Sequence, residues 1–172
     1  MGCTNILTLT GLPCTGKTTI GNILSKKLGF PFIDLDDYIV SKYKNSISNI
    51  FRLLGENTFR EYEKESLTEI IKKGNTSLVL SLGGGTVCYK DNLSLCLNNS
   101  KVIWLNPTLD ILEKRLLKNE AKKRPLFQGT NIIQKLQELY KTRLPFYRQS
   151  HIIIAVKKAN VNYTVNQIIN AI

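Results

Sequence analysis

The feature that most constrains the fold is an eight-residue loop, Gly11 to Thr18, which has the pattern GxxxxGK[ST]. An apolar run from Ile6 to Thr10 predicts a buried strand before the loop, and a helical pattern follows from Lys17 to Leu28. A strand, this loop and a helix in that order form a concave site whose backbone N–H groups attract phosphate. The alternative is a chance Gly-Lys-Thr in a strand-to-helix turn, against which the matching context argues.

The loop predicts an ATP and Mg²⁺ site. Lys17 can reach the β- and γ-phosphates, and the Thr18 hydroxyl can bind Mg²⁺ directly. The candidate ATP-binding residues are Gly11, Leu12, Pro13, Cys14, Thr15, Gly16, Lys17, Thr18 and, in the first helical turn, Thr19.

Short apolar runs alternate with helical stretches along the rest of the chain. Further strands are expected at 32–34, 78–82, 102–105 and 152–156, and further helices at about 37–43, 56–73, 108–118, 130–147 and 161–172. Pro145 should bend the fourth of these helices or end it early. Apolar strands joined by helices predict an α/β domain with a parallel sheet covered on both faces. Ligands bind beyond the carboxyl ends of such strands.

Composition limits the other possibilities. The 172 residues suffice for one domain, and no apolar run approaches the ~20 residues of a membrane span. The net charge of +11 comes mainly from scattered lysines, which indicate a solvated surface rather than a nucleic-acid footprint. The N-terminus lacks a signal-peptide pattern. The four cysteines form no CxxC pair, so we expect a reduced, cytoplasmic protein without zinc or disulfides.

Acidic residues follow the second predicted strand. In extended geometry Asp34 and Asp36 point to the same face, where one can orient a water on Mg²⁺ and the other can contact a polar substrate group. A hydroxyl that attacks phosphorus needs positioning and an acceptor for its proton. Helix capping is the alternative, and we expect it mainly of Asp37.

Three arginines are candidate anion-binding residues. Arg60 can pair with Glu63 at i, i+3, and Arg143 precedes an apolar Pro-containing turn. Together with the backbone of Gly83–Gly85 they would suit a small anionic substrate, although surface solvation is the alternative for each arginine. Arg124 falls in a basic segment, about 118–130, which predicts a mobile lid over the transferring phosphate or, alternatively, an ordinary loop.

Taken together, these motifs resemble the shikimate kinase family, in the P-loop nucleoside-monophosphate-kinase-like group. The motifs that carry the likeness are GxxxxGKTT at 11–19, Asp34-Leu35-Asp36, Gly55-Glu56…Phe59-Arg60…Glu63, Leu80 to Gly85, Arg124-Pro125-Leu126, and Arg143 with Pro145 and Tyr147. The resemblance implies transfer of the ATP γ-phosphoryl group to the 3-hydroxyl of shikimate, in aromatic amino-acid biosynthesis. It also implies a three-layer fold whose five-stranded parallel sheet has the order 2-3-1-4-5, in one kinase domain, 1–172, that is usually monomeric.

The resemblance also implies residue roles. It places shikimate on Asp36, Arg60, Gly83, Gly84, Gly85 and Arg143, within a substrate-binding region of about 34–62. It places Mg²⁺ on Thr18, with Asp34 and Ser81 acting through water, and catalysis on Lys17, Asp36 and the lid residue Arg124, which also counts among the ATP-binding residues.

Cys14 and Thr15 depart from the family's usual glycine and small residue. A Cβ at Cys14 requires a negative φ, and we expect a buried, inert thiol there, with a thiol-sensitive site as the alternative. Whether Arg115 contacts adenine stays open. His151 is expected to be structural.

Two other functions remain as alternatives. One is a P-loop kinase for another small metabolite, such as gluconate or a nucleoside, and an uncharged acceptor such as a nucleoside would not need paired arginines. The other is a nucleotide-dependent regulatory or nucleic-acid-associated protein, for which the net charge is the only support.

Overall fold

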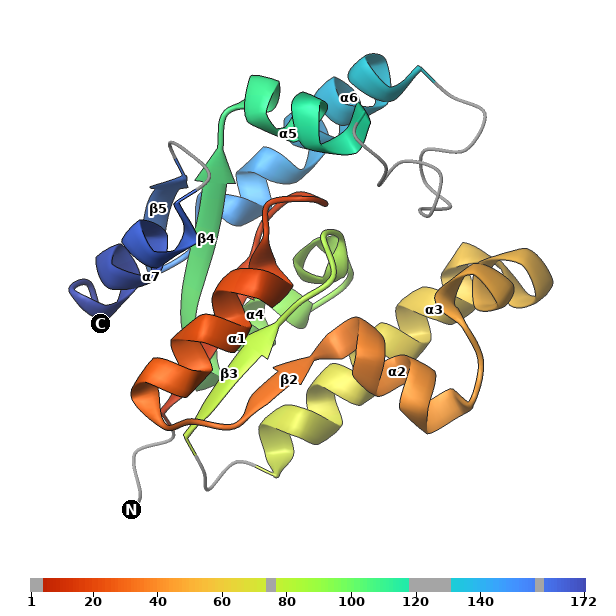
Figure 1. The fold of residues 1–172 in the computed structure, drawn as a ribbon. Helices are drawn as coiled ribbons and strands as arrows, with labels where there is room; N and C mark the ends of the chain where they lie inside the picture. The colour runs from red at the N-terminus through yellow and green to blue at the C-terminus, as the bar shows by residue number, and fades with distance from the viewer. Residues whose placement is uncertain (1–4, 74–76, 118–130, 157–159) are drawn as a thin grey trace.

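The computed structural model describes residues 5–73, 77–117, 131–156 and 160–172, and these form three layers (Figure 1). One sheet contains five parallel strands in the order β2-β3-β1-β4-β5. The strands are β1 (Ile6–Thr10), β2 (Phe32–Asp34), β3 (Leu78–Ser81), β4 (Lys101–Pro107) and β5 (Ile152–Val156). The predicted α/β class and the strand order are confirmed.

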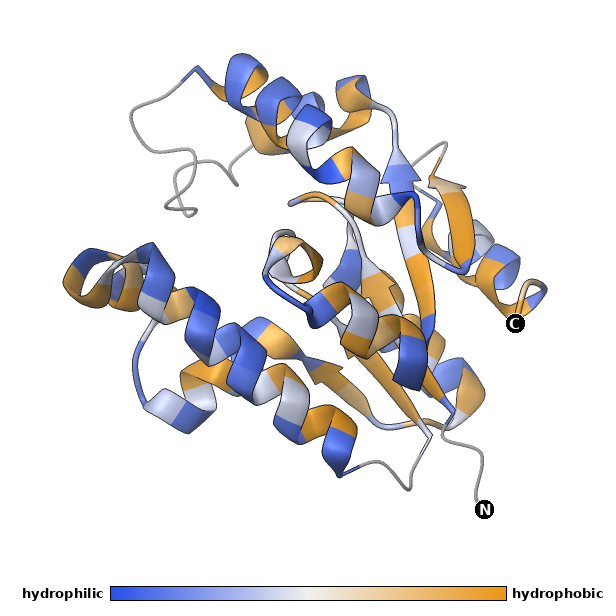
Figure 2. Cartoon of the chain, turned by 180° about the vertical axis from the view of Figure 1, so that it is seen from behind, coloured by the Kyte–Doolittle hydropathy of each residue, from blue (hydrophilic) through white to orange (hydrophobic). Residues whose placement is uncertain are grey.

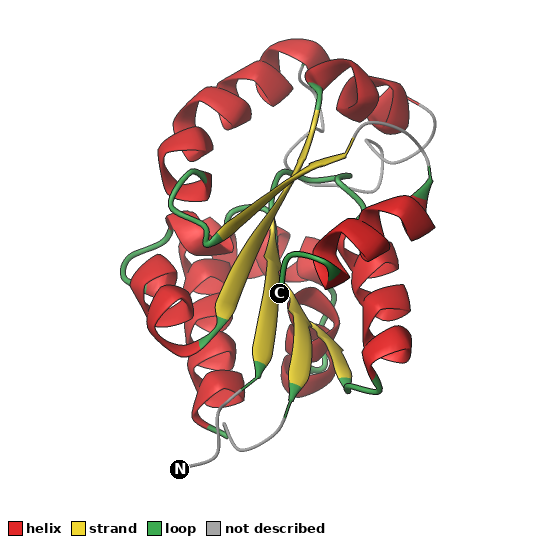
Figure 3. Ribbon diagram, turned by 90° about the vertical axis from the view of Figure 1, so that its left-hand side faces the viewer, coloured by secondary structure: helices red, strands yellow, loops and turns green. Residues whose placement is uncertain are grey.

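Helices cover both faces of this sheet (Figure 3). They are α1 (Lys17–Leu28), α2 (Leu35–Tyr43), α3 (Ile47–Lys72), α4 (Asn92–Asn99), α5 (Leu109–Arg115), α6 (Ile132–Tyr147) and α7 (Val161–Ile169), with a 3₁₀ turn, η1, at Thr86–Cys88. Among the helices of the described residues, none combines the length and apolar composition that a bilayer crossing requires.

Each face of the sheet has its own hydrophobic core, because alternate strand residues point to opposite sides. Leu7 and Leu9 of β1 pack with α1 and α7, whereas Trp104 of β4 packs with residues of α3 to α6. Figure 2 shows largely apolar strands, and helices along which apolar and polar stretches alternate. Two cores that share one sheet hold the carboxyl ends of the strands in fixed relative positions.

Several predicted boundaries were wrong. Helix α2 begins at Leu35 rather than at residue 37. Helix α3 begins at Ile47, where the Ser46 hydroxyl accepts a hydrogen bond from Asn49 N, and it kinks at Gly55 (φ 81°) near the predicted start. Strand β4 continues through Pro107.

Helix α6 does not end early, because it runs through Pro145 to Tyr147. Pro145 lies in the last turn and therefore removes only the helical bond to the carbonyl four residues earlier. Helix α4 was not predicted. Its eight residues, Asn92–Asn99, are too short and too rich in asparagine for a clear helical pattern.

Candidate active site

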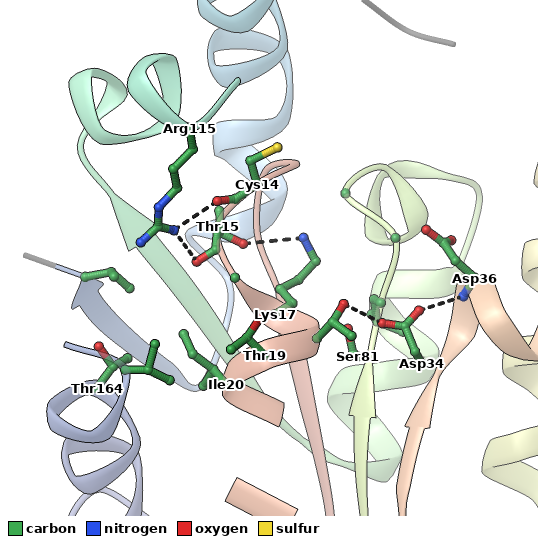
Figure 4. A pocket seen from close by; sticks show the side chains of 17 residues that line it. Cys14, Thr15, Lys17, Thr19, Ile20, Asp34, Asp36, Ser81, Arg115 and Thr164 are labelled. Atoms are coloured by element: carbon green, nitrogen blue, oxygen red, sulfur yellow. Dashed lines mark hydrogen bonds between the residues drawn. The ribbon is translucent and has the colours of Figure 1, made fainter. Parts of the chain in front are cut away.

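The phosphate loop joins β1 to α1 at the carboxyl edge of the sheet (Figure 4). Lys17, in the first turn of α1, is buried, and its Nζ donates to Gly11 O and Leu12 O at 2.9 Å. A third contact runs from Nζ to Thr15 Oγ1 at 3.4 Å. The ammonium group is therefore held inside the curve of the loop, where a concave backbone would receive phosphate.

Cys14 has neither the negative φ nor the buried thiol that the sequence analysis predicted. Its φ is +62°, a left-handed conformation that side chains other than glycine seldom adopt, and it is half-buried rather than buried. Arg115 Nη1 donates to both Cys14 O and Thr15 O at 3.0 Å, and Figure 4 shows its side chain reaching the loop from α5. These two bonds hold the carbonyls of the strained turn.

A cavity of about 590 Å³ follows the loop on its outer side. At one end it is bounded by Asp36 and Gly83, and at the other by residues of β5 and α7. Its lining residues are Cys14, Thr15, Gly16, Lys17, Thr18, Thr19, Ile20, Asp34, Asp36, Ser81, Leu82, Gly83, Gly84, Arg115, Val156, Val161 and Thr164. Sequence reasoning missed Ile20, Leu82, Val156, Val161 and Thr164, since their positions within the predicted helices and strands carried no site signal.

Asp34 links the phosphate loop to α2. Its Oδ2 accepts a 2.7 Å hydrogen bond from Thr18 Oγ1, and its Oδ1 accepts from Asp36 N at 3.1 Å. Asp34 is thus the N-cap of α2, so the capping role predicted for Asp37 was wrong. Burial, and then the charge of Asp34, raise the pKa of Asp37.

Asp36 lies in the first turn of α2, so the extended geometry assumed for it was also wrong. It nevertheless lines the same cavity as Asp34 and Ser81.

The oxygens of Thr18, Asp34 and Ser81 suit Mg²⁺ in their chemistry. They are hard donors on one cavity wall, and Mg²⁺ typically takes one or two protein oxygens together with phosphate and water. Across the described ranges no group of three or more His, Cys, Asp or Glu side chains could hold a metal ion. A cage built wholly from such side chains is therefore not what this part of the chain offers.

The glycines Gly83–Gly85 bring three polar side chains together. A Cβ added at the first glycine would lie 3.2 Å from Asp36 Oδ1, and one at the second 3.2 Å from Arg143 Nη1 and 2.9 Å from Pro13 Cδ. One at the third would lie 2.9 Å from both terminal nitrogens of Arg60. The backbone can approach these groups so closely only because it carries no side chains here.

Arg60 is buried and held by two carboxylates of its own helix. Its Nη1 donates to Glu63 Oε2 at 2.5 Å, which confirms the predicted pair, and its Nη2 donates to Glu56 Oε1 at 2.9 Å. Burial lowers the pKa of Arg60, but the charges and hydrogen bonds of Glu63 and Glu56 together outweigh burial, so the net shift of the pKa is upward. The guanidinium is thus a fixed positive charge.

Arg143 is also buried, at 7% exposed, and its Nη1 has no hydrogen-bond partner among the described residues. Tyr147, one turn further along α6, donates its hydroxyl to Gly84 O and stacks on Trp104, with ring centroids 5.7 Å apart. Burial raises the pKa of Tyr147, which keeps the phenol a donor. Tyr147 therefore anchors the helix that carries Arg143 against the glycine turn.

Not every predicted site residue lines the cavity. Gly11, Leu12 and Pro13 are absent from its walls, and so are Arg60, Gly85 and Arg143, which lie beside its Gly83–Gly84 end. Arg124 and the lid at 118–130 lie outside the described residues. His151 Nδ1 accepts a 3.0 Å hydrogen bond from Val102 N, in keeping with the structural role predicted for it.

A parallel sheet of this order, with a phosphate loop after β1 and paired arginines near β3, defines a P-loop kinase for small substrates. The family model for shikimate kinase matches residues 13–172. The chain is 39% identical over 165 residues to a shikimate kinase from Thermus thermophilus, covering 95% of this chain and 87% of that one. The chain belongs to the shikimate kinase family, and it is an ATP-dependent enzyme.

Solved structures agree with this assignment. The shikimate kinase from Acinetobacter baumannii in complex with shikimate has a TM-score of 0.91 and 32% identity, covering 97% of this chain and 92% of that one. The shikimate kinase from Bacteroides thetaiotaomicron has a TM-score of 0.87 and 31% identity, covering 97% of each chain.

Proposed function

We propose that this chain transfers the γ-phosphoryl group of ATP to the 3-hydroxyl of shikimate, giving shikimate 3-phosphate and ADP on the route to chorismate and the aromatic amino acids. The carrying observation is the gathering of Arg60, Arg143 and Asp36 around Gly83–Gly85, beside the phosphate loop. The relative in complex with shikimate supports this choice of acceptor.

The two arginines would hold the carboxylate of the acceptor. A guanidinium binds a carboxylate through two parallel hydrogen bonds, and such bonds are stronger when both groups are charged and shielded from water. Arg143 offers a buried Nη1 that has no hydrogen-bond partner in the part of the chain that the structure describes, and Arg60 is fixed by Glu63. The backbone of Gly83–Gly85 would add contacts to the acceptor's ring and hydroxyls.

In the transfer step the acceptor hydroxyl oxygen forms a bond to the γ-phosphorus while the bond to the β,γ-bridging oxygen breaks. Asp36 would orient this hydroxyl and take its proton, and Lys17 would stabilise the negative charge of the β- and γ-phosphates. ADP leaves with the electron pair of the broken bond.

Mg²⁺, when bound, would neutralise charge on the phosphate oxygens. Thr18 would contact the ion directly, and Asp34 and Ser81 would act through water. The remaining loop residues, Gly11 to Gly16 and Thr19, would bind ATP through the backbone and first helical turn. For Arg124 the support is the family motif alone, and its proposed place is over the transferring phosphate.

We further propose that residues 1–172 form one kinase domain with its acceptor-binding region at about 34–62 and a lid at about 118–130. It would act as a monomer on small molecules, without nucleic-acid or membrane partners. The scattered cysteines, which form no CxxC pair, would suit a reducing compartment such as the cytoplasm.

A coupled assay of ADP release tests the function, with ATP, Mg²⁺ and shikimate, gluconate, a nucleoside or no acceptor. Release that depends on shikimate alone, and that Asp36→Asn lowers by at least about a hundredfold, is expected. Turnover with another acceptor would overturn the assignment of shikimate as the substrate. ADP release at the same rate with every acceptor and with none would overturn the transfer reaction.

A further inference from the structure

We propose that Thr86 is a positioning residue for acceptor binding: its hydroxyl fixes the Glu63 carboxylate, which in turn holds the Arg60 guanidinium in place for the acceptor's carboxylate. The inference rests on the proposed function of Arg60. Thr86 directly follows the three glycines and belongs to none of the site residues described above.

Glu63 is fully buried, so both of its carboxylate oxygens need partners. Oε2 accepts from Arg60 Nη1 at 2.5 Å, and Oε1 accepts from Thr86 Oγ1 at 2.6 Å. The carboxylate is therefore held from both ends. Without the hydroxyl, Oε1 would be buried without this donor, and the hydrogen bond to Arg60 would alone fix the carboxylate about its last torsion.

Thr86 is itself a rigid support. It is fully buried and β-branched, which restricts its χ1 rotamer. Its carbonyl accepts a 2.9 Å hydrogen bond from Nδ2 of the buried Asn92, and its N–H donates to Gly83 O at 3.3 Å. The hydroxyl thus points at Glu63 from a backbone fixed on both sides.

The glycines leave room for this chain of contacts. A Cβ at Gly83 would lie 2.6 Å from Glu63 Oε1 and 2.9 Å from Thr86 Oγ1, too close to both oxygens of their hydrogen bond. A Cβ at Gly85 would lie 3.0 Å from Arg60 Cζ, so the guanidinium rests against the bare backbone. The same glycine turn therefore lies against the Thr86–Glu63–Arg60 network and also against Asp36 and Arg143.

The test measures kcat and KM for shikimate and for ATP in the full-length enzyme. Thr86→Val keeps the shape and removes the hydroxyl, Thr86→Ala removes it with less bulk, and Thr86→Ser retains it. Thr8→Val is the matched control, because Thr8 is equally buried and its hydroxyl donates to Ser100 Oγ at 2.7 Å, at the opposite end of the sheet. Thermal unfolding of every variant accompanies the kinetics.

We expect Thr86→Val and Thr86→Ala to raise the KM for shikimate about tenfold, the scale of one buried hydrogen bond, and to leave the KM for ATP within about twofold. The KM for shikimate of Thr86→Ser should lie within about threefold of the wild-type value. Both KM values of Thr8→Val should match those of the wild type. Unchanged kinetics in both hydroxyl-free variants overturn the positioning role. So do equal rises in both KM values, or a serine variant as impaired as valine, which indicate a purely structural residue. A wild-type enzyme inactive on shikimate overturns the proposed function itself.

Discussion

The Thr18 hydroxyl donates a 2.7 Å hydrogen bond to Oδ2 of Asp34 and so ties the first turn of α1 to the end of β2. The other oxygen of Asp34 caps α2 by accepting from Asp36 N. One carboxylate therefore joins the phosphate loop to the helix that carries the proposed proton acceptor. The Asp34 side chain therefore has a structural role and a proposed catalytic role, and two substitutions distinguish them.

Asp34→Asn should keep the cap, because asparagine caps helices as well as aspartate does, but it should lower kcat at least about tenfold by removing charge from the Mg²⁺ environment. Asp34→Ala should lose the cap as well, at about 1 kcal/mol of unfolding free energy. Urea unfolding and steady-state kinetics measure the two effects. Equal stability losses in both variants would contradict the capping role.

The two carboxylates that hold Arg60 should differ in their contribution to stability. Glu63→Gln removes a charged partner from the buried guanidinium and should lower the free energy of unfolding by about 3 kcal/mol. Glu56→Gln, at a half-exposed carboxylate, should cost less than about 1 kcal/mol. Urea unfolding followed by circular dichroism compares them, and similar midpoints would contradict the assigned difference in burial.

ATP binding by the phosphate loop should depend on the backbone conformation of Cys14 rather than on its thiol. Cys14→Val places a β-branched side chain at φ +62° and should cost about 1 kcal/mol while raising the KM for ATP. Cys14→Gly relieves the strain and Cys14→Ala tests the thiol, and both should keep a KM for ATP near that of the wild type. Loss of activity in the alanine variant would show instead that the thiol itself contributes.

Asp37 gives a pH dependence with a definite sign. Because the folded state raises its pKa, the ionised form is disfavoured, and this penalty is present at neutral pH and absent below the unfolded pKa. Asp37→Asn should therefore raise the thermal unfolding temperature at pH 7, and the gain should vanish near pH 3.

Asp91 provides a control of opposite sign. Its hydrogen bond with Lys64 lowers its pKa, so Asp91→Asn should destabilise at pH 7, again with no effect at low pH. If the unfolding temperatures of the two variants shifted in the same direction at pH 7, the opposite pKa shifts assigned to Asp37 and Asp91 would be contradicted.

The local parts of the fold were predictable from the sequence. The limits of β1 and α1 match the prediction residue for residue, because a strand of five apolar or threonine residues, the Gly-Lys-Thr loop and the closing Gly29 are all local signals. The Arg60–Glu63 pair followed from helical spacing in the same way.

Exact element boundaries, loop conformation and contacts between distant segments were not predictable. Asp34 rather than Asp37 caps α2 because β2 ends directly in the helix, and residue types alone do not give that boundary. The cavity walls at Val161 and Thr164, and the Thr86–Glu63 bond, arise from packing across 23 or more residues of chain. The φ of Cys14 follows from the closed loop around it rather than from its own preference.

The central claim is that Arg60 and Arg143 bind the carboxylate of shikimate, and it is tested most directly by comparing shikimate with its uncharged primary amide. The measurement is the ratio of kcat/KM for acid and amide in the wild type, in Arg60→Lys and in Arg143→Lys. Arg148→Lys serves as the control, since Arg148 lies exposed at the end of the same helix as Arg143. We predict an acid preference of at least about a hundredfold in the wild type and the control, falling at least about tenfold in the other two variants. An amide that reacts as well as the acid, or an acid preference that survives in both arginine variants, would contradict the account.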